Sequence, residues 1–530
     1  MRILDDASRF AVRQVIDQYT EALRKIPGFV AAEPGFPVVD GEVLLEPAVL
    51  VFVDEKKSIS HLLPSERAPR QLGPYRVAVM QADPERQVAA RADELGALLP
   101  ELSSEDLTYE GLPGDPIDQP HEVTGKFLCH AGPDAGWPVL KTFLLGTRER
   151  LTAAMYDFNA GHVIATFIDT VRALDVPTTL TWDDGMTPAE TAVRQRLRQA
   201  LGQKLDGWIV RCGGGRRFAS AYHEKVAVRD SRAFWLSSGN WSWKSQPDID
   251  PIARPADARS MFSRGNREWH VIVDDKPLSE LFERYIRHDR DGSEAEQQAG
   301  APGVVLGAEE RLAFPDLFVP LETFAPSFDL AVPEPAPPAT LPSASRSITV
   351  QPLLSPDNYL ARVRELIASA ERSLYLQFSY ITWSAAQRDR GFTELLRDLA
   401  ERSYAPGLDL RIIVGNNSAP EKIRRLVEAG FNPRVFRVQT NVHNKGIIAD
   451  GERVLVSSAN WSSDGVLRNR DAGIVIHDAE IAAYYQAIFL DDWDNRARAR
   501  LDDGPPVRVA GTEEPTPRGM VRVSWADYFG

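Results

Sequence analysis

The sequence is short of the features that direct a protein out of the cell or into a membrane. It has only two cysteines, Cys129 and Cys212, in 530 residues, which is too few for a disulfide framework. Its first residues, MRILDDASRFAVRQ, contain no apolar stretch typical of a secretory signal, and no run of about 18 apolar residues predicts a membrane span. We therefore expect a cytoplasmic protein without an integral membrane segment.

The chain also lacks an overall excess of positive charge. Its formal net charge is −14, and residues 1–125 alone carry 22 acidic against 12 basic side chains. A protein that binds nucleic acid generally must neutralise phosphates, so this balance argues against that class. Basic residues are concentrated instead in residues 211–232 (six against two acidic) and 411–445 (seven against two). Each run could be a solvated face, but together they favour an anionic substrate bound locally.

A chain of this length predicts about three or four domains. The composition predicts five regions: a small N-terminal α/β module of unknown role (1–125), a first half (126–288), a Pro/Ala-rich linker (289–346), a second half (347–500) and a C-terminal tail (501–530). The linker contains AVPEPAPPATLPSAS, whose five prolines favour an extended, irregular chain.

One short pattern occurs in each half. HEKVAVRD begins at His223 and HNKGIIAD begins at His443, and each is followed by two serines and then by Asn-Trp-Ser. The flanking segments also match as strand–helix pairs, such as NREWHVIVDDKPLSELF and NRDAGIVIHDAEIAAYY. Strands that alternate with helices predict an α/β fold. We expect a duplicated α-β-α sandwich with pseudo-twofold symmetry, in which two equivalent edges form one site.

The repeated residues suit a phosphoryl group. Side chains alternate along a strand, so the histidine and lysine of each copy point the same way. Two histidines, two lysines and two asparagines around one cavity supply donors and positive charge for a phosphate. The predicted phosphate-binding set is completed by the serines: Asn240, Asn460, Ser238 and Ser458. No carboxylate pair is placed for a divalent cation, so we expect no metal and no cofactor.

Two histidines can also divide the chemical work. One imidazole can attack phosphorus, and the other can protonate the leaving oxygen and later deprotonate water. A neutral imidazole of fixed tautomer needs a carboxylate on its other nitrogen, and Glu268 and Asp471 stand downstream in the two halves. Asp230 and Asp450 precede turns, so a role in holding the turn is as plausible as a catalytic one.

These residues resemble the motifs of the phospholipase D superfamily, whose members carry two His-x-Lys-x4-Asp sequences. The resemblance covers about residues 130–290 and 347–500, and it implies metal-independent phosphodiester cleavage or transfer through a phosphohistidine. It assigns six catalytic residues: His223, Lys225, Asp230, His443, Lys445 and Asp450. By analogy His223 is the nucleophile and His443 the acid and base, and Glu268 and Asp471 match the family's histidine-orienting acids.

One spacing differs between the halves. His223 and Glu268 are 45 residues apart, whereas His443 and Asp471 are 28 apart, so the first half has 17 extra residues that we expect in a loop. The assignment of Glu268 therefore rests on weaker grounds than that of Asp471.

Three functions fit this constellation. The first is a phosphodiesterase of phospholipase D type that acts on a phospholipid or another small diester, which the acidic charge favours mildly. The alternative is a nuclease of the same superfamily, which the basic runs favour. A degenerate binding module is disfavoured because both copies are intact, and a cardiolipin-synthase type is disfavoured because no membrane anchor is found. One chain supplies both half-sites, so a monomer suffices for a complete site.

Overall fold

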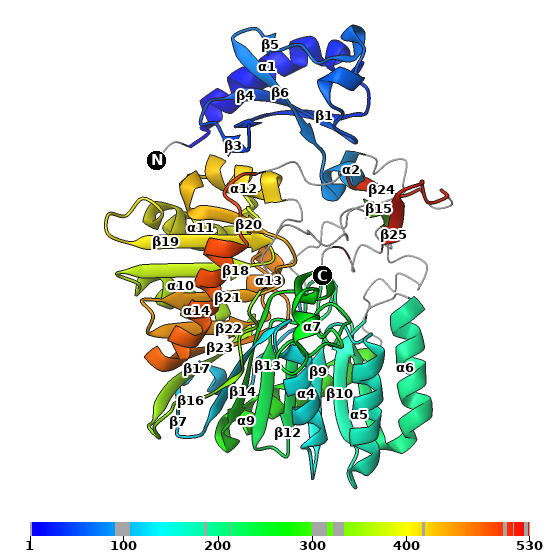
Figure 1. The fold of residues 1–530 in the computed structure, drawn as a ribbon, viewed down its shortest axis with the longest axis vertical. Helices are drawn as coiled ribbons and strands as arrows, with labels where there is room; N and C mark the ends of the chain where they lie inside the picture. The colour runs from blue at the N-terminus through cyan, green and yellow to red at the C-terminus, as the bar shows by residue number, and fades with distance from the viewer. Residues whose placement is uncertain are drawn as a thin grey trace.

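Two large β-sheets form the body of the protein (Figure 1). The computed structural model describes residues 3–90, 107–184, 188–213, 215–298, 315–321, 333–415, 419–501, 506–511, 514–523 and 528. Each large sheet has eight strands and belongs mainly to one half of the chain. Among these residues no helix is both long and apolar enough to cross a bilayer.

The first sheet has the strand order β11-β10-β9-β12-β13-β14-β8-β16. Strands β9, β10 and β11 are parallel to one another, and the remaining neighbours are antiparallel. The bounds are β8 Phe127–Gly132, β9 Leu151–Met155, β10 Thr178–Asp183, β11 Leu205–Val210, β12 Lys225–Arg229, β13 Ala233–Ser237, β14 Glu268–Asp274 and β16 Ala339–Leu341.

The second sheet repeats this arrangement with the order β20-β19-β18-β21-β22-β23-β17-β7. Strands β18, β19 and β20, at one end of this sheet, are parallel to one another. The bounds are β7 His121–Val123, β17 Ile348–Ser355, β18 Ser373–Phe378, β19 Asp409–Gly415, β20 Phe436–Gln439, β21 Lys445–Ala449, β22 Arg453–Ser457 and β23 Asp471–His477. The matching orders confirm the predicted α/β class and the duplicated sandwich.

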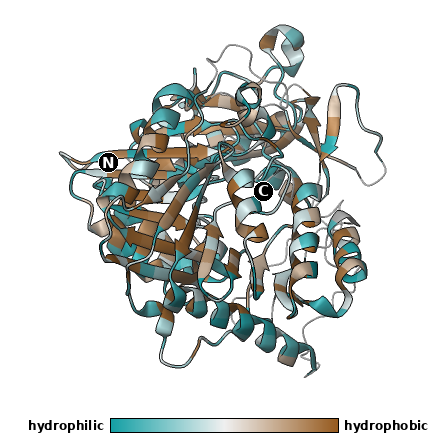
Figure 2. Cartoon of the chain, turned by 60° about the horizontal axis from the view of Figure 1, so that its bottom comes forward, coloured by the Kyte–Doolittle hydropathy of each residue, from teal (hydrophilic) through white to brown (hydrophobic). Residues whose placement is uncertain are grey.

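Helices lie on both faces of each sheet. The outer face of the first sheet packs against α4 (Gly136–Leu145) and α5 (Gly161–Ala173), and that of the second against α10 (Tyr359–Ala368), α11 (Arg390–Arg402) and α12 (Ala419–Glu428). Between the sheets, α9 (Lys276–Gln298) and α14 (Ala479–Asn495) share one apolar core with both. Figure 2 shows the hydrophobic colouring concentrated on the strands, as expected for sheets buried on both faces.

The halves exchange short strands at this shared layer. Strand β7 precedes the first half in sequence but pairs with β17 of the second sheet, and β16 pairs with β8 of the first. The region 289–346 was expected to be irregular, yet it holds the end of α9, β15 (Leu317–Pro320) and β16. Its residues 299–314 and 322–332 lie outside the described residues. Pairing to strands distant in sequence explains why local composition did not reveal β15 and β16.

The C-terminal tail forms a small sheet with the same region. Strand β15 lies between β24 (Arg508–Val509) and β25 (Met520–Val523), and both neighbours run antiparallel to it. Helix α2 (Pro84–Ala90) packs beside β24, so the N-terminal region contacts the C-terminal tail here.

The N-terminal module is an α/β unit with a four-stranded sheet of order β1-β4-β6-β5. Helix α1 (Asp6–Leu23) covers one face of it. Its strands are β1 Phe29–Gly35, β4 Ala48–Val53, β5 Gln71–Leu72 and β6 Tyr75–Gln81, and the two-stranded hairpin beside them is β2 Val38–Val39 and β3 Glu42–Val43. The α1 face buries Val12, Ile16 and Leu23 against this sheet.

A buried ion network docks this module onto α12 of the second half. Arg424 is fully buried and contacts Glu33 at 2.9 Å, Glu421 at 2.7 Å and Glu428. Arg86 of α2 lies 2.8 Å from both Glu33 and Glu421. The basic run 411–445 therefore contributes one of its arginines to an internal contact rather than to a free surface.

Replacing Arg424 is expected to weaken the docked module. Arg424→Met leaves buried carboxylates without their central cation, which costs about 3–5 kcal/mol when one partner of a buried pair is removed. The matched control is Arg425→Met, because Arg425 also contacts Glu421 at 2.7 Å but its side chain is 45% exposed; it should cost less than about 1 kcal/mol. Urea unfolding measures both, and equal losses would show that Arg424 does not hold the module.

Candidate active site

The two repeated motifs meet where the halves face each other. Strand β12 begins at Lys225, which pairs with Met155 of β9, and β21 begins at Lys445, which pairs with Phe378 of β18. Since β9 and β18 are equivalent strands, the two motifs occupy equivalent positions. His223 and His443 precede these strands and are only 5% and 4% exposed. The pseudo-twofold relation thus brings both copies to one location.

Backbone hydrogen bonds join each histidine to the opposite half. The amide of His223 donates to the carbonyl of Arg470 at 2.7 Å, and the amide of His443 donates to that of Arg267 at 3.1 Å. Isolated bridges pair Tyr222 with Arg470 and Arg267 with Val442. Each motif is therefore held in place by the strand that begins beside it in the other half.

The histidine–carboxylate pairs also cross between the halves. Nδ1 of His223 lies 2.7 Å from Oδ1 of Asp471, and Nδ1 of His443 lies 2.7 Å from Oε1 of Glu268. The spacings counted from the sequence paired each histidine with the acid of its own half, so that pairing is wrong. The reason is geometric, because β14 and β23 begin at the interface beside the other half's histidine. Each carboxylate fixes its imidazole with Nδ1 as the donor and Nε2 as the acceptor.

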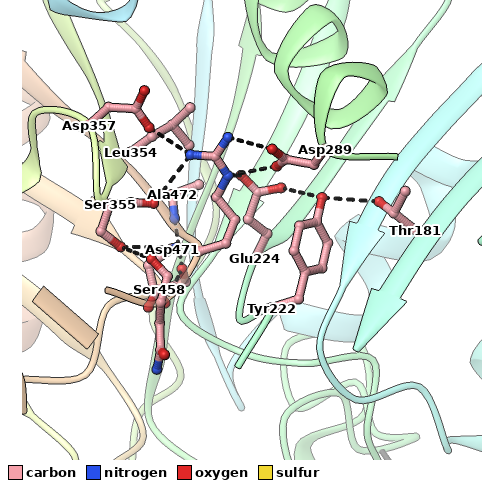
Figure 3. Close-up of polar contacts among 12 residues, drawn as sticks. Thr181, Tyr222, Glu224, Asp289, Leu354, Ser355, Asp357, Ser458, Asp471 and Ala472 are labelled. Carbon is pink, nitrogen blue, oxygen red and sulfur yellow. Dashed lines mark hydrogen bonds and ion pairs between the residues drawn. The ribbon is translucent and has the colours of Figure 1, made fainter. Parts of the chain in front are cut away.

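The two serines contact these carboxylates rather than forming an open phosphate site. The Ser238 hydroxyl donates to Glu268 at 2.5 Å and the Ser458 hydroxyl donates to Asp471 at 2.8 Å; Figure 3 includes the second contact. Each hydroxyl also accepts from a β-strand amide of its own half, at Trp269 and Ala472 respectively. Both serines are fully buried, so their predicted role in phosphate binding is corrected to holding the acids.

Burial and neighbouring charge keep the histidines neutral. Burial, followed by the charge of Lys225, lowers the pKa of His223 to about 3 against the opposing effect of Asp471. Burial likewise lowers the pKa of His443. Burial alone would raise the pKa of Glu268, but His443, Lys445 and Ser238 bring it to about 2, so the carboxylate stays charged. A neutral imidazole on a charged carboxylate is the state that a nucleophile requires.

The two lysines have no exposed surface and lie close enough for their charges to interact. Nζ of Lys225 donates to the carbonyl of His223 at 2.8 Å, and Nζ of Lys445 lies 2.6 Å from the carbonyl and 2.8 Å from Nε2 of His443. Burial lowers the pKa of Lys445 to about 7, and burial followed by Lys445 lowers that of Lys225. An anion between two such ammonium groups would stabilise both charges.

The two asparagines have different surroundings. Oδ1 of Asn460 accepts from the hydroxyl of Ser379 at 2.8 Å, whereas Oδ1 of Asn240 is buried without a hydrogen bond to any described residue. The position equivalent to Ser379 is Tyr156, because each follows the residue that pairs with a motif lysine. The Tyr156 ring meets His223 edge-on at 4.6 Å, and Nζ of Lys225 lies 5.0 Å from its centre. The pocket is therefore asymmetric despite the duplicated motif.

Asp230 and Asp450 lie at the far ends of the motif strands. Each follows its motif lysine by five residues, or about 16 Å of strand. The Asp230 carboxylate accepts from the amides of residues 148–150, and that of Asp450 accepts from the amides of 371–373. Both residues have positive φ, at 54° and 57°. Their predicted catalytic role is corrected to holding a turn, since neither reaches the pocket.

Sequence reasoning missed residues around the pocket that no motif names. Tyr156 had no counterpart of its own kind in the second half and therefore gave no repeated signal. Arg267 and Arg470 did carry a signal, because each stands directly before an orienting acid in the matched NRE and NRD. The described residues contain no group of three or more His, Cys, Asp or Glu side chains arranged to hold a metal ion.

Comparison with known proteins finds a family model that matches part of the second half. Residues 363–493 match a family model described as "Cardiolipin synthase, PLD-like domain". A mitochondrial cardiolipin hydrolase of Chlamydomonas reinhardtii is 27% identical over 138 residues, which is 26% of this chain and 57% of the relative. A phospholipase D of Rickettsia conorii is 29% identical over 133 residues, 24% of this chain and 60% of the relative. The alignments thus span less than two thirds of these relatives.

Solved structures are similar at lower identity. A phosphatidylserine synthase of Haemophilus influenzae is 12% identical with a TM-score of 0.42, over 73% of this chain and 88% of that one. A phospholipase D family member of Salmonella typhimurium is 22% identical with a TM-score of 0.24, over 28% of this chain and 97% of that one.

The turn role of Asp450 leads to a test that separates stability from binding. Burial opposes the shift, but the amides of residues 371–373 lower the pKa of Asp450, so its charged form stabilises the fold. Asp450→Asn keeps a residue that tolerates positive φ and removes the charge, at an expected cost of about 1–2 kcal/mol in urea unfolding. Calorimetry should show the affinity for inorganic phosphate changed by less than about twofold. Lost phosphate affinity at unchanged stability would return Asp450 to the site.

Proposed function

Since the chain belongs to the phospholipase D superfamily, we propose that it is a metal-independent phosphodiesterase that acts through a phosphohistidine. The supporting observation is the pair of neutral histidines, each on a carboxylate of the opposite half, around two buried lysines. This constellation supplies a nucleophile, a proton carrier and positive charge for one phosphoryl group. The proposed substrate is a phospholipid or another small diester.

His223 is the proposed nucleophile. Its Nδ1–H donates to Asp471, so the lone pair of Nε2 is available, and no described residue donates a hydrogen bond to that nitrogen. Nε2 of His443, in contrast, lies 2.8 Å from the ammonium of Lys445. This difference agrees with the family analogy. In the first step Nε2 of His223 forms a bond to phosphorus while the bond from phosphorus to the leaving oxygen breaks.

His443 is the proposed acid and base. His443 is neutral in the free site, and binding of the anionic diester beside it favours uptake of a proton on Nε2. In the first step it gives this proton to the leaving oxygen, and the Glu268 carboxylate on Nδ1 stabilises the charged form. In the second step His443 takes a proton from water, the water oxygen bonds to phosphorus, and the bond to His223 breaks. Lys225 and Lys445, together with Asn240 and Asn460, are the proposed ligands of the phosphoryl oxygens.

The surface favours a lipid over nucleic acid. Several residues of the two basic runs have partners within the protein, such as Arg437 with the carbonyl of Trp493 and the buried Arg217 with Asp289. They therefore do not make a continuous stripe of free cations for a nucleic-acid backbone. Three residues after Asn240, Trp243 is 50% exposed, and Ile252 of the same insertion is 42% exposed. Exposed apolar side chains near the motif suit a lipid surface.

The function is tested by head-group release from mixed phospholipid vesicles in EDTA. Wild type should release a head group at full rate, whereas His223→Ala and His443→Ala should each lose at least about 10³-fold, because nucleophilic and acid–base catalysis are removed. Circular dichroism should show both variants folded. Dependence on added metal, or full activity in either variant, would contradict the mechanism. Cleavage of single-stranded DNA instead of lipid would identify the nuclease alternative.

The site should also bind anions less well as the pH rises. Lys445 is charged below its pKa of about 7 and neutral above it, so an anion loses one favourable charge between pH 7 and 9. Sulfate keeps its charge throughout this range and is a suitable competitive inhibitor. Its inhibition constant is expected to rise about tenfold for each pH unit above 7 as the charged fraction falls. An inhibition constant that stays flat from pH 6 to 9 would show that Lys445 does not titrate there.

A further inference from the structure

An arginine stands directly before the orienting acid in both halves, and both arginines are buried. Arg470 is fully buried before Asp471, and Arg267 is 2% exposed before Glu268. Neither guanidinium has a role in the chemistry proposed above. A buried guanidinium is costly unless carboxylates and carbonyls surround it, so such a pair of residues calls for a specific role.

Both arginines have the same kinds of partner. Nε and Nη2 of Arg470 contact the two oxygens of Asp289 in α9 at 2.6 and 2.7 Å, and Nη1 contacts Asp357 at 2.7 Å. Nε and Nη2 of Arg267 contact the two oxygens of Asp492 in α14 at 2.8 and 3.1 Å, and Nη1 contacts Asp134 at 2.5 Å. In each case the fork engages a helix of the other half and a loop of its own half.

This anchoring reaches the histidine of the opposite half through the backbone. The Arg470 amide donates to the carbonyl of Ala221 at 3.1 Å, and its carbonyl accepts from the amide of His223 at 2.7 Å. The next residue, Asp471, accepts from Nδ1 of His223. These three hydrogen bonds orient His223, and all of them come from Arg470 and Asp471 at the start of β23. The side-chain contacts of Arg470 hold that end of the strand in place. Arg267 and Glu268 make the equivalent contacts to the second motif.

One difference between the two arginine clusters is a carboxyl group that lies beside Arg470. Glu224, between His223 and Lys225, lies 3.9 Å from Nε of Arg470 and accepts from the Tyr222 hydroxyl at 3.1 Å (Figure 3). The equivalent residue in the second half is Asn444, whose amide donates to Gln377. Gln377 in turn donates to Asp492, so neutral amides occupy the place that a carboxyl group has beside Arg470.

The charged groups that face Glu224 determine its titration. They are Arg470 and Asp471 at the start of β23, Asp289 on α9, and Tyr222 on its own segment. Burial raises the pKa of Glu224 to about 8, and Asp289 and Asp471 raise it while Arg470 and Tyr222 lower it. Glu224 is therefore neutral at pH 7 and becomes charged above about pH 8. Its charge would then compete with Asp289 for Nε of Arg470.

We propose that Arg470 and Glu224 form a positioning cluster that orients His223, and that this cluster, unlike the one around Arg267, loosens when Glu224 ionises. The proposal rests on the proposed function for its kinetic consequence. It predicts that alkaline pH weakens the nucleophilic step selectively and leaves the acid–base residue in place.

The kinetic test uses bis(4-nitrophenyl) phosphate, whose leaving group departs without protonation. The burst of nitrophenolate then reports attack by His223, and the later steady rate reports hydrolysis with His443 as base. Arg470→Lys should slow the burst at least tenfold, whereas the matched control Arg267→Lys should slow the steady rate at least tenfold and leave the burst within twofold. Equal effects of the two variants on both phases would overturn the proposal.

The pH test uses Glu224→Gln, which has the shape of the neutral acid and is the safer variant for folding. At saturating diester, where weaker substrate binding no longer matters, the wild-type burst rate should fall at least fivefold between pH 7.5 and 9.5. Loss of the Lys445 charge affects both proteins equally, so the Glu224→Gln burst rate should fall at least threefold less than that of wild type over the same range. The same alkaline fall in both proteins would show that Glu224 does not tune His223.

Hydrogen exchange tests the anchoring without any turnover. Arg470→Lys should accelerate amide exchange at least tenfold in residues 221–225 and leave 441–445 within twofold, and Arg267→Lys should do the reverse. Uniform acceleration in both segments would overturn the crossed positioning. If wild type releases no nitrophenolate, the proposed function fails, whereas a failure of this exchange pattern alone refutes the positioning role.

Discussion

The crossed pairs between histidine and carboxylate are the constraint on which the rest of the structure depends. His223 is oriented by Asp471 and His443 by Glu268, so neither half has a complete site by itself. The halves must therefore meet in one register, and much of the fold serves that meeting. Helices α9 and α14 share a core with both sheets, and β7 and β16 each pair with the other half's sheet. A shift at this interface would break both pairs at once.

The same interface creates the electrostatic state of the pocket. Removing two lysines and two histidines from water disfavours their charged forms, and the shifts of their pKa values all have burial as the largest cause. The Glu268 carboxylate remains charged because His443, Lys445 and Ser238 lower its pKa against the effect of burial. The site is thus preorganised for an anion, which would supply negative charge beside the lysines.

The sequence predicted the residues of the site better than their partners. A motif written twice identified both histidines, both lysines and both asparagines, and the strand–helix repeats predicted the duplicated sandwich. It could not predict that the acids would cross, because spacing along the chain favours partners within a half. The packing of β14 beside β21 and of β23 beside β12 across the interface reverses this. The sequence placed the serines at the phosphate and left Asp230 open between a turn and catalysis, because a position within a repeat does not reveal which way its side chain points.

Long-range pairing also limited the prediction of the rest of the fold. The strands β15 and β16 lie in a segment whose prolines indicated an irregular linker, and both are strands only because distant strands present open edges. The basic run around Arg424 indicated a substrate surface, yet docking of the N-terminal module turned part of it into an internal ion network. The number of charges in a segment does not show whether its side chains face a substrate or form an internal ion network.

The differences between the halves explain how a duplicated motif could serve two chemical roles. Perfect symmetry would give both histidines the same environment, and neither would be preferred as nucleophile. Two differences near His223 break that symmetry. The first half has Tyr156, whose ring contacts His223, where the second half has Ser379. It also has Glu224, the residue after His223, where the second half has Asn444. The common framework fixes the distance between the histidines, while these substitutions tune one of them. The sequence differences within the repeat therefore carry as much functional information as its identities.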